Sequence, residues 1–234
     1  MIKFFRKIRY DLMEKNKTEK YFKYAIGEII LVVIGILIAL NINTLNNNRI
    51  ERIKERNLLN NLHADFLLNK VQFDSTKTIH QDQLRRYHKI ISYFPIENYS
   101  TFNDTLWKYE KDIRFRSFNP ASGTVNAIIN SGNLNIIQND TLQEYLTKWI
   151  DVLNDYIEEE NVYIRFLTNL TTPYMLKEAD LLNNNKLTES TSLREYQNMI
   201  LHQIFLINQV IEAQTKEPIE NCIEEIIRLS KPEK

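Results

Sequence analysis

The chain has 234 residues and balances 30 Lys and Arg against 30 Asp and Glu. A net charge of zero gives no electrostatic reason to expect a nucleic-acid-binding protein. Its single cysteine, Cys222, excludes an intramolecular disulfide framework. Composition therefore leaves location and function to be sought in the order of the residues.

The most apolar stretch is Ala25–Ile42 (AIGEIILVVIGILIALNI), 18 residues with one charged side chain, Glu28. As an α-helix it rises about 27 Å, close to the hydrocarbon thickness of a bilayer. We therefore predict a single transmembrane helix over residues 24–44. A cleaved signal peptide is the main alternative, but its apolar region is usually shorter, and no small-x-small cleavage site follows this stretch.

Basic side chains gather before the apolar stretch. Residues 1–24 hold eight cations against three acids, and Lys and Arg close to a spanning helix are retained on the cytoplasmic side. We predict that residues 1–23 form a cytoplasmic basic amphipathic segment and that residues 45–234 form a periplasmic domain. A disordered positive tail is the alternative for the first segment.

Four residues of the apolar helix are candidate helix–helix contacts: Gly27, Glu28, Gly35 and Ala39. Gly35 and Ala39 form a small-xxx-small pair that lets another helix approach closely, although glycine is also common in membrane helices. Glu28 lies near the cytoplasmic headgroups, where snorkelling, protonation or a partner helix would satisfy it. We expect a structural or partner-contacting role for Glu28 rather than an ion path.

Helical periodicity dominates the rest of the chain. One apolar stripe predicts that the spanning helix continues outward to about residue 93, with room for a break around residues 46–48; it comprises Leu59, Leu62, Phe66, Phe73, His80, Tyr87, Ile90 and Phe94. Asn69 and His80 fall on this stripe, and we predict that both are buried, hydrogen-bonded residues rather than ligands.

Capping signals then divide the middle of the chain. Asn103 is the predicted cap of a short helix over residues 101–111, and Asn119-Pro120 is predicted to open a helix that Ser131-Gly132 closes. Asn139 or Asp140 is the predicted cap of the next helix.

Two long helices follow in the prediction. The first runs from the Asn139 cap to about Leu170, with residues 158–160 on its solvent face. The last begins near Thr191 and kinks or restarts at Pro218. The predicted fold is all-α: an N-terminal single transmembrane helix followed by an antiparallel helical bundle with long helices and short connecting helices.

The sequence offers no chemistry of a recognisable kind. The four histidines are scattered, and no metalloprotease, nucleophile, phosphate-binding or dinucleotide motif is present. We predict no catalytic, cofactor-binding or metal-binding residues and no enzymatic activity. The aromatic residues Trp107, Tyr109, Phe115 and Phe118 form the candidate partner surface; the alternative is that they close one end of the bundle.

Three segments resemble a known family: MIKFFRKIR at the start, YAIGEIILVVIGILIALNIN over residues 24–43, and INSGNLNIIQNDTLQEYL over residues 129–146. They are similar to an uncharacterised family of short single-pass membrane proteins from the Bacteroidota, a domain of unknown function. The chain departs from the family pattern just after the span, where residues 41–46 lack the usual tryptophan. The resemblance implies a bacterial inner-membrane protein with a periplasmic domain, and it implies no activity.

The expected function is therefore non-enzymatic. We predict an inner-membrane-anchored protein that contacts the lipid bilayer and whose periplasmic helical domain mediates protein–protein interaction or self-assembly. The alternative is a periplasmic ligand sensor that signals through the transmembrane helix.

Overall fold

The computed structural model describes residues 10, 18–96, 99–110, 114–180, 182, 186–187, 193–216 and 218–232. Most of the predicted amphipathic segment, residues 1–9 and 11–17, lies outside the described residues. The chain divides into two compact units, Met1–Glu55 and Arg56–Lys234. Each unit is described by itself below.

The first described helix, α2 (Thr18–Ile91), is continuous, so the break considered around residues 46–48 is absent. No glycine or proline occurs between residues 36 and 94, and asparagine lowers helix stability by less than about 1 kcal/mol per residue. The helix ends shortly before Pro95, in keeping with the restriction that proline places on the residue before it. In the N-terminal unit, the large apolar side chains from Ile26 to Ile42 are exposed.

The remaining elements are short or medium helices with one small strand pair. In chain order they are α3 (Tyr99–Glu110), α4 (Gly123–Asn130), the 3-10 turn η1 (Asn133–Ile136), α5 (Asp140–Phe166), the π-helical turn η2 (Leu167–Thr171), α6 (Thr172–Glu178), β1 (Ala179–Asp180), β2 (Lys186–Leu187), α7 (Leu193–Lys216) and α8 (Ile219–Leu229). The two strands pair antiparallel, with Ala179 opposite Leu187. The predicted all-α class is confirmed.

Three predicted helix boundaries are confirmed. The side chain of Asn139 accepts a hydrogen bond from the Leu142 amide at 2.9 Å and so caps α5. Ser131 ends α4, and Gly132 follows in the left-handed conformation with φ of +70°. Pro218 separates α7 from α8 and restarts the helix.

Two predicted boundaries are wrong. Asn103 lies inside α3 instead of capping it, because its side chain hydrogen-bonds both the amide and the carbonyl of Leu187 at 3.0 Å. Pro120 does not open a helix, since α4 begins at Gly123. Residues 114–122 instead form a segment without helix or strand, which we call the strap.

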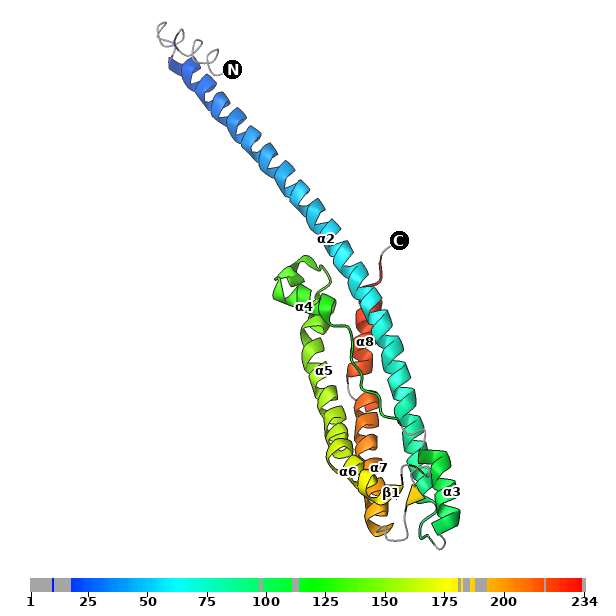
Figure 1. Cartoon of the computed structure of the whole chain (residues 1–234). Helices are drawn as coiled ribbons and strands as arrows, with labels where there is room; N and C mark the ends of the chain where they lie inside the picture. The colour runs from blue at the N-terminus through cyan, green and yellow to red at the C-terminus, as the bar shows by residue number, and fades with distance from the viewer. Residues whose placement is uncertain are drawn as a thin grey trace. The chain divides into compact units, whose positions relative to one another are not determined.

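The C-terminal unit is a helical bundle that includes one parallel pair (Figure 1). Contacts from α2 to α5 advance together along both helices, from Phe66–Trp149 through Phe73–Tyr156 to Tyr87–Tyr163, so these helices run in the same direction. Helix α5 is antiparallel to α7 and α8, and the strap returns the chain to the start of α5 (Figure 1). The predicted antiparallel arrangement therefore holds for α5 with α7 and α8 but not for α2 with α5.

The core lies between these helices and is rich in aromatic rings. Phe66 meets Trp149 edge-on at 4.9 Å between ring centroids, and Phe73 meets Phe118 at 5.2 Å. All four side chains are fully buried. Burying a ring of this size stabilises the fold by roughly 1.5–3 kcal/mol, which makes this cluster a main source of its stability.

The strap has no regular secondary structure, and side chains from the helices satisfy its backbone. Asn69 accepts from the Ala121 amide at 2.8 Å and donates to the Ala121 carbonyl at 3.0 Å. His80 Nε2 donates to the Arg116 carbonyl at 2.8 Å. The prediction that Asn69 and His80 are buried and hydrogen-bonded is confirmed.

Glu160 corrects the sequence analysis, which placed residues 158–160 on the solvent face. Its side chain is buried, and both carboxyl oxygens accept from the Phe118 amide at 3.1 Å. Tyr156 donates to the same carboxyl group at 2.6 Å. Glu160 therefore fastens the strap to α5.

Candidate functional site

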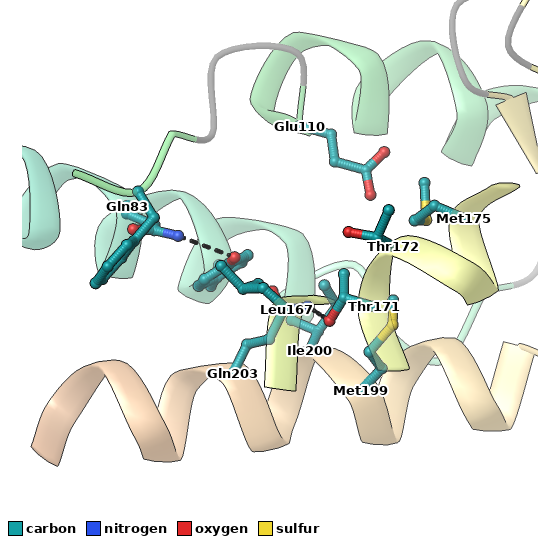
Figure 2. A pocket seen from close by; sticks show the side chains of 11 residues that line it. Gln83, Glu110, Leu167, Thr171, Thr172, Met175, Met199, Ile200 and Gln203 are labelled. Carbon is teal, nitrogen blue, oxygen red and sulfur yellow. Dashed lines mark hydrogen bonds between the residues drawn. The ribbon is translucent and has the colours of Figure 1, made fainter. Parts of the chain in front are cut away.

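A cavity of about 270 Å³ is the candidate functional site of the C-terminal unit. Five elements and the strap contribute its lining: Gln83 and Tyr87 from α2, Glu110 from α3, Phe115 from the strap, Leu167 and Thr171 from η2, Thr172 and Met175 from α6, and Met199, Ile200 and Gln203 from α7. Apolar side chains form much of the wall, and a few polar groups converge on the space, as in pockets that bind small ligands (Figure 2).

A π-helical turn forms one side of the cavity. Helix α5 changes to π-helix over Leu167–Thr171 before α6 begins. The turn places Thr171 opposite α7, where Gln203 donates a hydrogen bond to the Thr171 hydroxyl at 2.8 Å (Figure 2). Single π-turns inserted between α-helical segments occur frequently at functional sites.

Glu110 supplies the carboxyl group of the cavity. It is the last residue of α3, and its carboxyl group points toward Thr172 and Met175 (Figure 2). Tyr196 donates a hydrogen bond to Glu110 Oε1 at 2.9 Å. Burial raises the pKa of Glu110 to about 7, against the opposing effect of the Tyr196 hydrogen bond. The group therefore changes charge near neutral pH.

A neutral polar cluster forms the wall on the α2 side. Gln83 donates to the hydroxyl groups of Tyr87 and Tyr163 at 3.1 and 2.6 Å, and the two hydroxyl groups lie 3.0 Å apart. Burial raises the pKa of Tyr87 to about 12 and raises that of Tyr163 further. Both phenols therefore remain uncharged near neutral pH and leave Glu110 as the ionisable group of the lining.

Phe115 joins the cavity to a second polar network behind it. Its ring lines the cavity and stacks on His80 with 4.6 Å between centroids. His80 Nδ1 faces the Gln214 amide nitrogen at 2.8 Å, and that nitrogen also donates to Tyr156 at 2.9 Å. Since Nδ1 accepts and Nε2 donates, the imidazole is neutral; burial lowers its pKa to about 4. This network supports the strap, and its neutral imidazole is not part of the cavity lining.

The three predicted partner-surface residues whose side chains are described are buried or partly buried. Phe118 is fully buried, and Phe115 and Tyr109 are partly buried. Tyr109 packs against Tyr93 at 6.4 Å between ring centroids. The side chain of Trp107 lies outside the described residues. Contact of these aromatic residues with a partner stays a prediction.

The predicted contact residues of the apolar helix lie in the N-terminal unit. A Cβ built on Gly27 or Gly35 meets no heavy atom within 4 Å, and Ala39 is exposed. Glu28 is partly exposed. These positions leave that helix surface open within a single chain. Whether another helix contacts it stays a prediction.

Sequence reasoning missed Glu110 and Glu160, although the helical period marks both. Glu160 continues the buried series of Trp149 and Tyr156 on α5, and Glu110 lies four residues after buried Leu106 on α3. Both were overlooked because a carboxyl group inside an amphipathic helix is normally assigned to the solvent face. Within the described residues, no group of three or more His, Cys, Asp or Glu is placed to hold a metal ion.

A family model of unknown function, DUF6090, matches residues 28–171, which is more than half of the chain. The chain belongs to this family. The resemblance to a family of unknown function is thereby confirmed, and the matched range runs from the apolar helix to the end of η2. Family membership covers the α2, α3, strap and η2 parts of the cavity lining, whereas the α6 and α7 parts lie beyond it. No curated protein and no solved structure matches the chain.

Proposed function

We propose that this family member is a single-pass protein of a bacterial inner membrane, in which residues 24–44 cross the bilayer and residues 45–234 form a periplasmic domain. One observation carries the proposal. An 18-residue window of the helix beginning at Ala25 has a mean hydropathy of 2.6, and none of it is buried within the chain. Exposing this much apolar surface to water costs roughly 25 cal/mol per Å², and a bilayer removes that cost.

The direction of insertion follows from the flanking charges. Eight Lys and Arg residues precede the apolar stretch within residues 1–24, against three acids. The stretch after it, residues 42–48, carries no charge. The excess of cations before the helix favours a cytoplasmic N-terminus.

The proposed biochemical role is recognition without catalysis, through association with a protein partner or a second copy of the chain. The open helix surface at Gly27, Gly35 and Ala39 supports this role, since small residues let a second helix approach and gain van der Waals contact.

Crosslinking of the full chain in native membranes, followed by mass spectrometry, tests this role. We expect a crosslinked dimer or a specific co-purifying protein. Gly35→Leu should weaken the crosslink because the larger side chain keeps a second helix farther away. Ile36→Leu, at the next position around the helix, should preserve the crosslink. Recovery of monomers alone, with no co-purifying protein, would contradict the proposal.

The cavity favours a second candidate function, a periplasmic sensor that binds a small ligand. Its walls come from α2, α3, the strap, η2, α6 and α7, so an occupant would contact segments that are far apart in the sequence. A thermal-shift screen of small metabolites against the full chain in detergent distinguishes the two candidates. A clear rise in melting temperature with one metabolite supports the sensor, and no rise with any of them argues against it.

A further inference from the structure

We propose that the cavity binds a small organic ammonium compound, whose cationic head pairs with the Glu110 carboxyl group and whose apolar body lies against Met175, Met199 and Ile200. This inference rests on the second candidate function and names its ligand class. It does not depend on membrane insertion or on association of the apolar helix.

The charge of the lining selects against anions. Glu110 is the one acidic side chain among the eleven lining residues, and none of the eleven is Lys, Arg or His. An anionic ligand would therefore meet a carboxyl group with no compensating cation among these described lining residues. A cation forms a charge-assisted hydrogen bond there, and such bonds are roughly twice as strong as bonds between neutral groups.

The remaining lining decides between a metal ion and an organic cation. Calcium requires six to eight oxygen ligands, and magnesium a near-octahedral oxygen shell. The cavity offers one carboxyl group, the hydroxyl groups of Tyr87, Thr171 and Thr172, and the amide oxygens of Gln83 and Gln203, beside methionine, leucine and isoleucine side chains. A divalent ion would therefore meet a single negatively charged ligand. Of the hydroxyl groups, Thr171 already accepts from Gln203. This composition suits an ammonium group attached to an apolar body.

The volume sets the size of the ligand. A cavity of 270 Å³ corresponds to roughly nine water molecules at about 30 Å³ each. It lies just below the usual range of small-ligand pockets, about 300–1,000 Å³, so the occupant is a compact amine rather than a peptide or a nucleotide. The rings of Tyr87 and Phe115 also line the space and offer aromatic surface to a cation or to an apolar body.

Titration of Glu110 makes the affinity depend on pH. Among the described residues, the ionisable groups facing Glu110 are the phenols Tyr196 from α7 and Tyr87 from α2, and Tyr174 from α6 packs on Tyr196. Burial raises the pKa of Tyr196 and of Tyr87, so both stay neutral, while the pKa of Glu110 is raised to about 7. Ammonium binding should therefore strengthen between pH 6 and pH 8 as Glu110 ionises.

Isothermal titration calorimetry on the full chain in detergent micelles tests the inference with three probes of similar shape: 2-phenylethylamine, 2-phenylethanol and 3-phenylpropanoate. We expect the amine to bind at least tenfold more tightly than the alcohol at pH 8, and the carboxylate to bind least. The preference for the amine should disappear in Glu110→Gln and persist in Glu158→Gln, which makes the same change at an exposed position of α5.

A second variant guards against loss of folding as the explanation. Thr172 lines the cavity but is exposed, so Thr172→Trp fills the space without disturbing the core and should abolish binding of the amine. Equal affinities for amine and alcohol would overturn the inference while leaving a ligand-binding function intact. Amine binding that survives Glu110→Gln, or no amine binding at millimolar concentration, would also overturn it.

Discussion

Individual polar side chains hold the strap against the helices of the C-terminal unit. His80 binds the Arg116 carbonyl, Glu160 binds the Phe118 amide, and Asn69 binds both backbone groups of Ala121. A segment without helix or strand needs side chains as hydrogen-bond partners for its backbone. An unpaired buried backbone group costs about as much free energy as a lost hydrogen bond. These side chains therefore take the place of a sheet.

The buried carboxyl group of Glu160 should make stability depend on pH. Burial raises its pKa from 4.5 to about 7, against the hydrogen bonds from Tyr156 and Phe118. A raised pKa means that the folded chain binds the proton more tightly, so this stabilisation is complete below pH 4.5 and is lost as pH rises through 7. Relative to wild type, Glu160→Gln should therefore gain on the order of 1–3 kcal/mol in free energy of unfolding between pH 5 and pH 8.

Urea denaturation of both proteins at each pH measures this difference. His80, whose lowered pKa gives the opposite pH dependence, is present in both and cancels in the comparison. Glu158→Gln, at an exposed position two residues earlier, should differ from wild type by the same amount at both pH values. A difference for Glu160→Gln that does not change with pH would contradict the burial of a titrating group.

Asn69 should be more important for stability than its polarity suggests. Asn69→Ala removes two hydrogen bonds to Ala121 and leaves two backbone groups without their partners, which should cost about 1–3 kcal/mol. Asn61→Ala, at an exposed position of the same helix, should change stability by less than about 0.5 kcal/mol. The midpoints of urea denaturation compare the two, and similar losses would show that the strap does not depend on Asn69.

The sequence analysis predicted the burial of Asn69 and His80 but missed that of Glu160, because it judged each residue by its neighbours in the sequence. Asn69 and His80 were recognised as buried because they interrupt a stripe of large apolar side chains. Glu160 occupies an equivalent position on α5 but follows Glu158 and Glu159, so it was grouped with a solvated run. Its burial depends on the amide of Phe118, a partner 42 residues away in the chain. The sequence analysis also missed Glu110. The cavity that it lines is completed by side chains from five further segments, which a local pattern does not bring together.

At the scale of elements, two glycines should respond in opposite ways to the same substitution. Gly132 has φ of +70°, so Gly132→Ala should destabilise the fold by about 1–2 kcal/mol through backbone strain, although space for a Cβ is available. Gly123 lies in α4 with open space around it, and Gly123→Ala should stabilise by about 0.4–1 kcal/mol by restricting the unfolded chain.

Thermal unfolding of the two variants measures these changes, and Gly132→Asn should lose less than Gly132→Ala because asparagine tolerates the left-handed conformation better. Destabilisation by Gly123→Ala together with tolerance of Gly132→Ala would contradict the assigned end of α4.

Local sequence signals were sufficient to predict several helix ends but not the strap. The Asn139 cap, the Ser131-Gly132 stop and the Pro218 restart act through neighbouring backbone groups, so the sequence shows them directly. Asn103 and Pro120 carry equally good capping signals, yet neither begins a helix. The Asn103 side chain bonds Leu187, and Pro120 lies in the strap. Ala121, which follows Pro120, bonds Asn69; these distant partners are not visible in a local pattern.

For the whole molecule, the sequence analysis predicted the all-α fold class correctly but predicted the wrong relative direction for helices α2 and α5. Long glycine-free helices and the lack of an alternating stretch of β-branched residues indicated an all-α, antiparallel bundle. Helices α2 and α5 are parallel because the strap carries the chain back along the bundle between them (Figure 1). Residues 114–122 have no hydrophobic period that would have revealed this return.

The account as a whole depends on the apolar helix remaining in a membrane with the helical domain on its outer side. Fusing alkaline phosphatase or green fluorescent protein after Lys234 of the full chain, in a bacterial host, tests this most directly. The proposed topology puts the C-terminal unit in the periplasm, so it predicts active phosphatase with no fluorescence, both fractionating with the membrane. A fluorescent green fluorescent protein fusion together with an inactive phosphatase fusion would contradict this placement. A mature N-terminus that begins after the apolar stretch would contradict it as well.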